Sequence, residues 1–174
     1  MSFIIQPYDI VRRPYRHSLW RMPVGSSTDK PSLALTFDDG PIPEQTPWVL
    51  DMLDKYGVKA TFFCVGDNIR KYPDVFREVV SRGHVAGNHT FHHVQLLKSS
   101  WKDYVEEIRL CKEEALKACD MVRMGLFRAP HGQMTPWRCR ELVEGSSEIT
   151  KQLGIDKLVF WDVMPKDYDK RLTP

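Results

Sequence analysis

Residues 33–41 read Leu-Ala-Leu-Thr-Phe-Asp-Asp-Gly-Pro, a short apolar segment that leads into two carboxylates and a turn. Leucine, threonine and phenylalanine suit a β-strand, whereas a glycine followed by a proline does not continue a regular ladder. The pattern predicts a strand over 33–37 that ends in a loop carrying Asp38 and Asp39. Neighbouring residues of a regular strand point to opposite faces, so both carboxylates reach one site only if the strand has ended.

The segments around this strand alternate between strand and helix patterns. A capping threonine, a proline at the first helical position and a terminal glycine predict a helix over 46–56. Further strands are predicted at 60–65, 84–88, 126–128 and 158–163, and further helices at 73–82, 101–119 and from 135 onward. Repeated β/α units favour an α/β fold with a parallel sheet or barrel, whose chemistry lies at the C-terminal ends of the strands.

Length and charge limit what the chain can be. With 174 residues and 42% hydrophobic content it is expected to form one domain with a genuine core. It has 25 basic and 23 acidic residues, a net charge of +2, which gives no general attraction to nucleic acid or membranes. A basic stretch at 12–21 could hold a phosphate backbone, but no nucleic-acid module accompanies it. We therefore expect a solvated, partly packed N-terminal arm and no nucleic-acid partner.

The start of the chain and its cysteines bear on the cellular compartment. The four cysteines lack the C-x-x-C spacing of a redox or zinc motif, so we expect reduced thiols. The first residues form neither a signal peptide nor a span of ~20 apolar residues. We expect no transmembrane segment and, by default, a cytoplasmic location; the sequence carries no signal for an oligomeric state.

Two histidines complete a set of metal-ligand side chains. His89 and His93 are four residues apart, which would place both rings on one side of a helical turn and His92 elsewhere. A zinc-like ion with open coordination uses about three protein ligands drawn from His and Asp or Glu, which leaves room for water. A polar turn and a solvated histidine loop are the alternative interpretations. Together, the carboxylate pair and the histidine pair favour a hydrolytic metal site with one spare carboxylate.

Three motifs, in this order, resemble those of the polysaccharide deacetylases, also called the NodB homology domain or carbohydrate esterase family four. They are Thr-Phe-Asp-Asp-Gly-Pro at 36–41, His-Thr-Phe-His-His at 89–93 and Arg-Ala-Pro-His-Gly at 128–132. The resemblance covers 33–168 and implies a distorted, incomplete (β/α) barrel. We expect this catalytic domain to span 33–174, with 1–32 as an N-terminal arm packing on it. It also implies a metal-dependent hydrolase that removes acetyl groups, on nitrogen or oxygen, from chitin-like or peptidoglycan-like carbohydrates.

The resemblance also implies roles for the residues of the first two motifs. Asp39, His89 and His93 would bind a divalent metal ion, for which zinc is expected. Asp38 would be the general base that takes a proton from water. A carboxylate bound to the metal cannot readily accept a proton, so its neighbour outside the coordination shell would have to do so.

The third motif and a fourth, Trp-Asp-Val-Met-Pro-Lys-Asp-Tyr at 161–168, which also resembles the family, supply the remaining roles that the resemblance implies. Arg128 would pair with Asp38, and Asp167 would orient Arg128, although an ordinary structural ion pair is the alternative interpretation of these two residues. The backbone N–H of His131 would stabilise the oxyanion. Pro130, Gly132 and Tyr168 would line the substrate pocket beside it.

The chain departs from the family pattern in ways that affect substrate and catalysis. His131 replaces a tyrosine, while Met164 and Tyr168 replace an aspartate and a tryptophan, so the substrate shape is expected to differ. A Leu-x-x-His motif, whose histidine protonates the leaving amine in the family, does not follow Asp167. The final Thr-Pro at 173–174 suits the start of a helix, which predicts that the barrel is truncated at its C-terminal end.

The missing proton donor leaves alternatives open. One is that His131 acts as a substitute acid. Another is a metal-binding, carbohydrate-binding pseudoenzyme that lacks the general acid. The sequence does not distinguish these from a deacetylase that is complete in a longer chain.

Overall fold

The computed structural model describes residues 4–5, 13–21 and 33–165. Its strands are β1 (Ile4–Ile5), β2 (Ser18–Leu19), β3 (Thr36–Gly40), β4 (Thr61–Cys64), β5 (Val85–Asn88), β6 (Leu126–Phe127), β7 (Lys157–Val159) and β8 (Val163–Met164). Its α-helices are α2 (Gln45–Lys55), α3 (Gly66–Lys71), α4 (Pro73–Ser81), α5 (Trp101–Ala118), α6 (Pro136–Glu144) and α7 (Glu148–Leu153). Three 3₁₀ turns are η1 (Arg13–Tyr15), η2 (Leu96–Lys98) and η3 (Pro130–Gly132).

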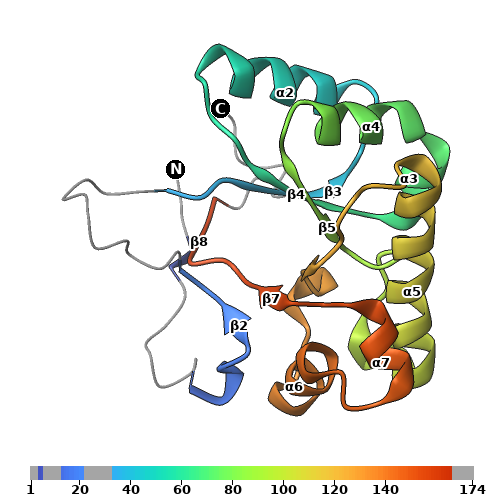
Figure 1. Ribbon diagram of the computed structural model, residues 1–174. Helices are drawn as coiled ribbons and strands as arrows, with labels where there is room; N and C mark the ends of the chain where they lie inside the picture. Colours follow the sequence, from blue (N-terminus) through green and yellow to red (C-terminus); the bar gives the residue numbers. More distant parts are fainter. Residues whose placement is uncertain (1–3, 6–12, 22–32, 166–174) are drawn as a thin grey trace.

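Six strands form one parallel sheet in the order β2-β7-β6-β5-β4-β3. Parallel neighbours need crossover connections, which here contain the helices, and these form an arc outside the strands from α2 through α4 and α5 to α7 and α6 (Figure 1). Within the described ranges, β2 and β3 are the two edges of this sheet and do not pair with each other. A separate antiparallel pair joins β1 to β8. The predicted α/β fold of the incomplete (β/α) barrel type is confirmed.

Most predicted elements are present within a few residues, but three differences matter. The strand predicted over 33–37 lies instead at Thr36–Gly40, so both carboxylates belong to it. The strand predicted over 158–163 is divided into β7 and β8. Helices α3 and α7 were not predicted, although α7 begins with a capping box between Ser147 and Thr150 that a sequence can reveal.

Helix α5 links the two halves of the core. Its buried side chains follow the helical period and are Tyr104, Val105, Ile108, Cys111 and Ala115. The last two pack in an apolar cluster with β4, α2 and α4, and the first three pack in a second cluster with β6, α6 and α7. Because α5 packs in both clusters, it supports the C-terminal ends of the strands in a fixed position.

Residues 13–21 of the N-terminal arm pack on the six-stranded sheet and supply its edge strand β2. Strand β2 pairs with β7, the Trp20 ring stacks on Phe160 at 4.3 Å, and the Tyr15 hydroxyl donates to the Met134 carbonyl at 2.7 Å. The predicted boundary between an arm at 1–32 and a domain at 33–174 falls at the end of residues 22–32, which lie outside the described residues. That division stays a prediction.

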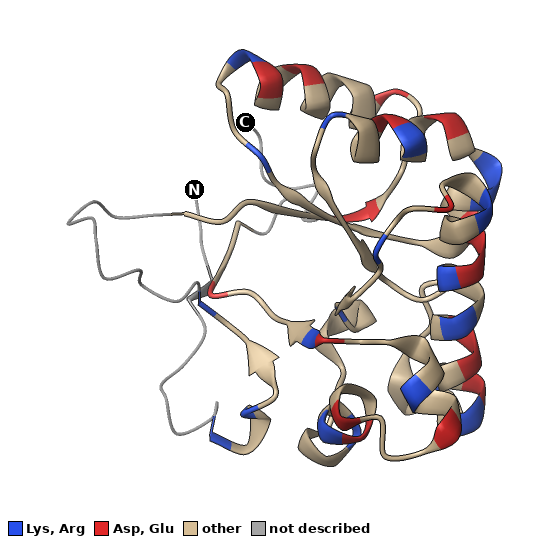
Figure 2. Cartoon of the chain, in the orientation of Figure 1, with Lys and Arg blue, Asp and Glu red and all other residues tan. Residues whose placement is uncertain are grey.

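The surface carries charges of both signs. Figure 2 shows acidic and basic residues interspersed along the outer helices. Pairs such as Arg109 with Glu106 on α5 account for part of this pattern. None of the described helices has both the length and the apolar character needed to cross a membrane. All four cysteines are free thiols, as predicted.

Candidate metal centre and active site

A bulge in β3 brings the paired carboxylates to the site. Asp38 lies opposite Phe63 and Gly40 lies opposite Cys64, so Asp39 is an extra residue in the ladder. Asp39 has a φ of 67°, a left-handed conformation that aspartate adopts more readily than most residues. The predicted loop at Asp38 and Asp39 is therefore wrong, because the strand continues through Gly40. The bulge, and not the end of the strand, interrupts the alternation of side chains between the two faces of the sheet.

The bulge is held from outside the strand. The side-chain amide of Asn68, on α3, donates to the Asp39 carbonyl at 2.8 Å. Nothing in the sequence marks Asn68 for this purpose, because its partner is a backbone group that lies 29 residues away. The position of Asp39 thus depends on both β3 and α3.

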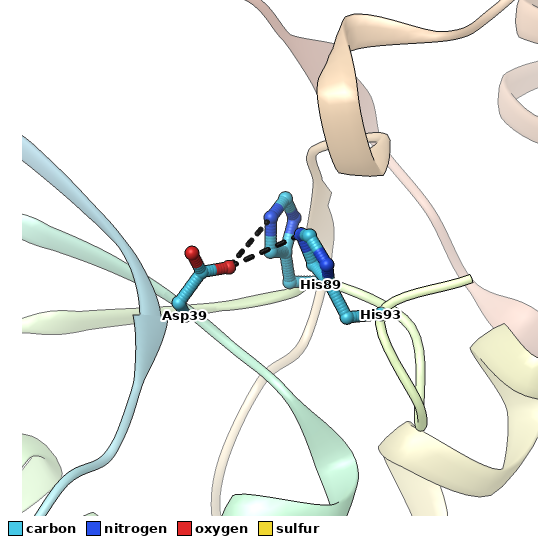
Figure 3. Close-up of side chains that lie close together, drawn as sticks. All are labelled: Asp39, His89 and His93. Carbon is cyan, nitrogen blue, oxygen red and sulfur yellow. Dashed lines mark ion pairs between the residues drawn. The ribbon is translucent and has the colours of Figure 1, made fainter. Parts of the chain in front are cut away.

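Asp39, His89 and His93 converge, as the metal-site prediction requires (Figure 3). The Asp39 Oδ1 atom lies 3.5 Å from the Nε2 atom of His89 and 3.2 Å from the Nε2 atom of His93. One ligand atom from each residue lies within 4.8 Å of the others. These three residues form a possible metal-binding triad at the C-terminal ends of β3 and β5.

The hydrogen bonds and charges around the triad suit a divalent ion. The Nδ1 atom of His89 lies 2.7 Å from the Arg128 carbonyl and donates its N–H there, which leaves Nε2 facing the site. Burial lowers the pKa of His93, with the Asp39 charge opposing, and the contact with His89 lowers the pKa of the Asp39 carboxyl. Neutral imidazoles and an ionised carboxylate are the forms that bind zinc-like ions.

The histidine segment is not a helical turn, contrary to the prediction. Residues 89–93 form a loop after β5, in which Thr90 and His93 have φ values of 64° and 55°. The two rings meet because the chain folds back on itself, with ring centroids 5.0 Å apart. His92 faces away from the triad, as expected, and contacts Glu107.

Asp38 is paired with a buried arginine. The Nη1 atom of Arg128 donates to Asp38 Oδ1 at 2.7 Å and to Thr36 Oγ1 at 2.8 Å. Arg128 is 3% exposed, and burial lowers the pKa of its guanidinium while the Asp38 charge opposes that shift. The pairing that the resemblance implied is therefore present in the structure.

Further groups hold Arg128 in its position. Its Nε and Nη2 atoms donate to the carbonyls of Val159 and Phe160 at 3.2 and 3.1 Å, and its guanidinium lies 4.2 Å from the Phe63 ring centroid. These backbone acceptors could not be predicted from the sequence, because every residue has a backbone carbonyl and residue identity does not show which carbonyl accepts. Asp167, which was predicted to orient Arg128, lies outside the described residues, so its role stays a prediction.

Replacing Arg128 by methionine is expected to lower the free energy of unfolding by about 3–5 kcal/mol, the usual effect of removing one partner of a buried ion pair. Two buried carbonyls and Thr36 would lose their charged donor. Urea unfolding measures this change. Arg123→Met is the control, since Arg123 is 82% exposed and forms only a surface ion pair with Asp156. Equal stability of the two variants would show that the Arg128 contacts do not stabilise the fold.

The turn η3 carries the residues predicted to form the oxyanion pocket. Pro130 is buried, whereas His131 is exposed, with its ring centroid 4.9 Å from that of His93. Gly132 has a φ of 66°, and a Cβ there would lie 2.6 Å from the Trp161 ring. The glycine is therefore needed both for its conformation and for close approach. Tyr168, the other predicted pocket residue, lies outside the described residues.

Within the described residues, one backbone N–H of η3 has no acceptor. The N–H groups of Gly132 and Gln133 donate to the Ala129 and Pro130 carbonyls at 3.0 and 3.2 Å. No acceptor within the described part of the chain lies in hydrogen-bond reach of the His131 N–H. A backbone N–H without a protein acceptor, in a turn whose His131 ring lies next to His93, is the type of donor that can stabilise a developing oxyanion.

Comparisons with known proteins agree with this geometry. The family model for polysaccharide deacetylases matches residues 16–154. A peptidoglycan-N-acetylglucosamine deacetylase of Bacillus cereus is 41% identical over 106 residues, which are 61% of this chain and 38% of that protein. A chitooligosaccharide deacetylase of a Bradyrhizobium species is 32% identical over 93% of this chain and 66% of its own length.

The solved structures give the same result. The peptidoglycan deacetylase PdaC from Bacillus subtilis superimposes with a TM-score of 0.67 at 33% identity, over 79% of this chain and 62% of that one. The chain thus spans from about a third to two thirds of the length of the relatives it matches. Since the family model covers most of the sequence and includes Asp38, Asp39, the histidine loop and Arg128, the chain belongs to the polysaccharide deacetylase family.

Proposed function

We propose that this chain is the catalytic region of a metal-dependent deacetylase that hydrolyses acetyl groups on N-acetylated sugars of chitin-like or peptidoglycan-like polymers. The observation that carries the proposal is the placement of Asp38, held by Arg128, beside the Asp39–His89–His93 triad. A ligand cluster and a separate, fixed carboxylate are what metal-assisted hydrolysis needs. Relatives named as peptidoglycan and chitooligosaccharide deacetylases support this choice of substrate class.

Asp39, His89 and His93 would hold the ion, for which we propose zinc. When bound, such an ion polarises a carbonyl and lowers the pKa of water in the site. The donor set of two imidazole nitrogens and one carboxylate oxygen fits zinc. The exposed carboxylate of Asp39 and the buried ring of His89 place this set at the border between solvent and core.

Asp38 would act as the general base. Its Oδ1 atom accepts from Arg128, while no donor among the described residues reaches Oδ2. The side chain of Asp38 is 33% exposed, so water can approach it. One oxygen therefore fixes the carboxylate, and the other can take the proton from the attacking water.

The His131 N–H would donate to the oxyanion that forms when water attacks the acetyl carbonyl. Pro130 and Gly132 set the direction of this N–H, because one is buried and the other packs on Trp161. Breakdown of the tetrahedral adduct releases acetate and an amine, and the leaving nitrogen needs a proton. The His131 ring lies beside His93 at the exposed side of the site, so its use as a substitute acid stays a prediction.

The proposal is tested by incubating the protein with Zn²⁺ and N-acetylglucosamine oligomers or peptidoglycan fragments. We expect acetate to appear in equal amount to free amine, which distinguishes amide from ester hydrolysis. Acetylated xylan provides the O-acetyl comparison. Binding of the oligomers without acetate release would favour the pseudoenzyme alternative, and release from acetylated xylan alone would overturn the N-acetyl assignment.

A further inference from the structure

The loop that carries the two metal-ligand histidines contains strained backbone. Thr90 and His93 are not glycines, yet both adopt left-handed conformations, each of which costs of the order of 1–3 kcal/mol. Such conformations persist only where surrounding contacts enforce them. The groups that hold residues 89–93 therefore decide whether His93 faces Asp39.

The first half of the loop is held by backbone and core groups. The Thr90 carbonyl accepts from Gly66 N–H at 3.0 Å, and the Phe91 carbonyl accepts from Asp67 N–H at 2.9 Å. The buried Asn88 side chain accepts from Thr90 N–H at 2.9 Å. These bonds fix the path of the chain as far as Phe91, two residues short of His93.

The second half depends on one carboxylate from α5. Glu107 Oε2 accepts from the His92 backbone N–H at 2.7 Å, and its Oε1 lies 2.8 Å from His92 Nδ1. Among the described residues, no other group forms a hydrogen bond with His92 or with the His93 backbone. Both oxygens of Glu107 are thus used on the residue immediately before the ligand.

Glu107 is itself well placed to act as a clamp. Its side chain is 15% exposed, and the Asn88 amide donates to the neighbouring Ile108 carbonyl at 2.8 Å, which ties α5 to β5. The next acidic residue, Glu106, differs: it is exposed and pairs with Arg109 on the same helix. The two glutamates are therefore a matched pair, of which only one reaches the histidine loop.

We propose that Glu107 is a positioning residue of the metal centre, which fixes the His92 peptide so that the His93 ring is held against Asp39. This inference rests on the proposed function, because it assumes that the triad binds a divalent ion. Glu107 does not touch the triad. It acts through the backbone, and its loss releases the strained conformation at His93 while His89 keeps its own bond to Arg128.

The test compares Zn²⁺ affinity, by competition with a chromophoric chelator, for the wild type, Glu107→Ala, Glu107→Gln and the control Glu106→Ala. We expect a dissociation constant about 10–100-fold higher for Glu107→Ala, the usual effect of losing a group that orients a ligand. Glu107→Gln keeps one acceptor oxygen for the His92 N–H and should lose less. Glu106→Ala should bind as the wild type does. The visible spectrum of the Co²⁺ forms reports whether His93 remains a ligand.

The outcomes separate the two proposals. If the wild type binds neither Zn²⁺ nor Co²⁺, the metal-site proposal fails. If the wild type binds and both Glu107 variants bind equally well with unchanged Co²⁺ spectra, the positioning role is wrong and the metal site stands. A lower unfolding temperature of the metal-free Glu107 variants with unchanged Zn²⁺ affinity would assign Glu107 to stability alone. If Glu107→Ala does not fold, the Zn²⁺ affinity and the Co²⁺ spectrum of Glu107→Gln test the positioning role instead.

Discussion

Asparagine in place of Asp38 is expected to lower kcat for acetate release by about 10²–10⁴-fold, the usual contribution of a general base. Asparagine has nearly the same shape and can still accept from Arg128 through its amide oxygen, but it cannot take a proton from water. The effect should therefore appear in kcat, with little change in KM. Initial rates of acetate release from a chitin-like oligomer measure it.

Two controls make the Asp38 result specific. Zn²⁺ affinity of Asp38→Asn should equal that of the wild type, because Asp38 is not in the triad. Asp51→Asn changes an exposed aspartate on α2 that pairs with Arg82, and it should leave the rate unchanged. If Asp38→Asn retained full activity, the base would have to be another group and the division of roles between the two carboxylates would be refuted.

Removal of the metal or of one ligand is expected to have a comparable effect. Dialysis of the wild type against a chelator should reduce acetate release to the background rate, and Zn²⁺ should restore it. In His89→Ala the Zn²⁺ dissociation constant should rise by more than about 100-fold, beyond the range for groups that only orient a ligand. His89 is 2% exposed, and its bond to the Arg128 carbonyl leaves it no alternative orientation.

The control for this experiment is His17→Ala. His17 is an imidazole that pairs with Glu144, away from the triad. It should bind Zn²⁺ and release acetate as the wild type does. Full activity after exhaustive removal of metal, or in His89→Ala, would exclude a metal-dependent mechanism for this chain.

Local patterns predicted the elements that have strong local signals. Helix α5 has apolar residues at the helical period, and α4 begins with a proline and ends before Gly83, so both could be located from the sequence. Helix α3 has only six residues and begins soon after β4 ends. It is too short for a helical period of apolar residues to be recognised in the sequence. The split between β7 and β8 depends on which neighbour each segment pairs with, and pairing is not a local property.

The residues of the site could also be predicted from the sequence, whereas the backbone geometry that brings them together could not. Residue types and spacing singled out Asp38, Asp39, His89 and His93, the resemblance to the family added Arg128, and the structure places all five together. The predictions of how the carboxylates and the histidines come together were wrong. They assumed that the strand ends before Asp38 and that residues 89–93 form a helical turn. The structure has a bulge at Asp39 and a left-handed residue at His93, each enforced by groups from α3 or α5.

The amino-acid sequence was sufficient to predict the α/β class, the family motifs and the donor atoms available for a metal. Those features depend on residue identity and on short local patterns, in which the period of a helix or strand can be recognised. Only the folded structure shows that the Val159 and Phe160 carbonyls hold Arg128, the partner of Asp38 across 90 residues, and that Glu107 anchors the histidine loop. These contacts involve backbone groups or distant side chains, and their energies depend on which surfaces the packing of the sheet and α5 brings together.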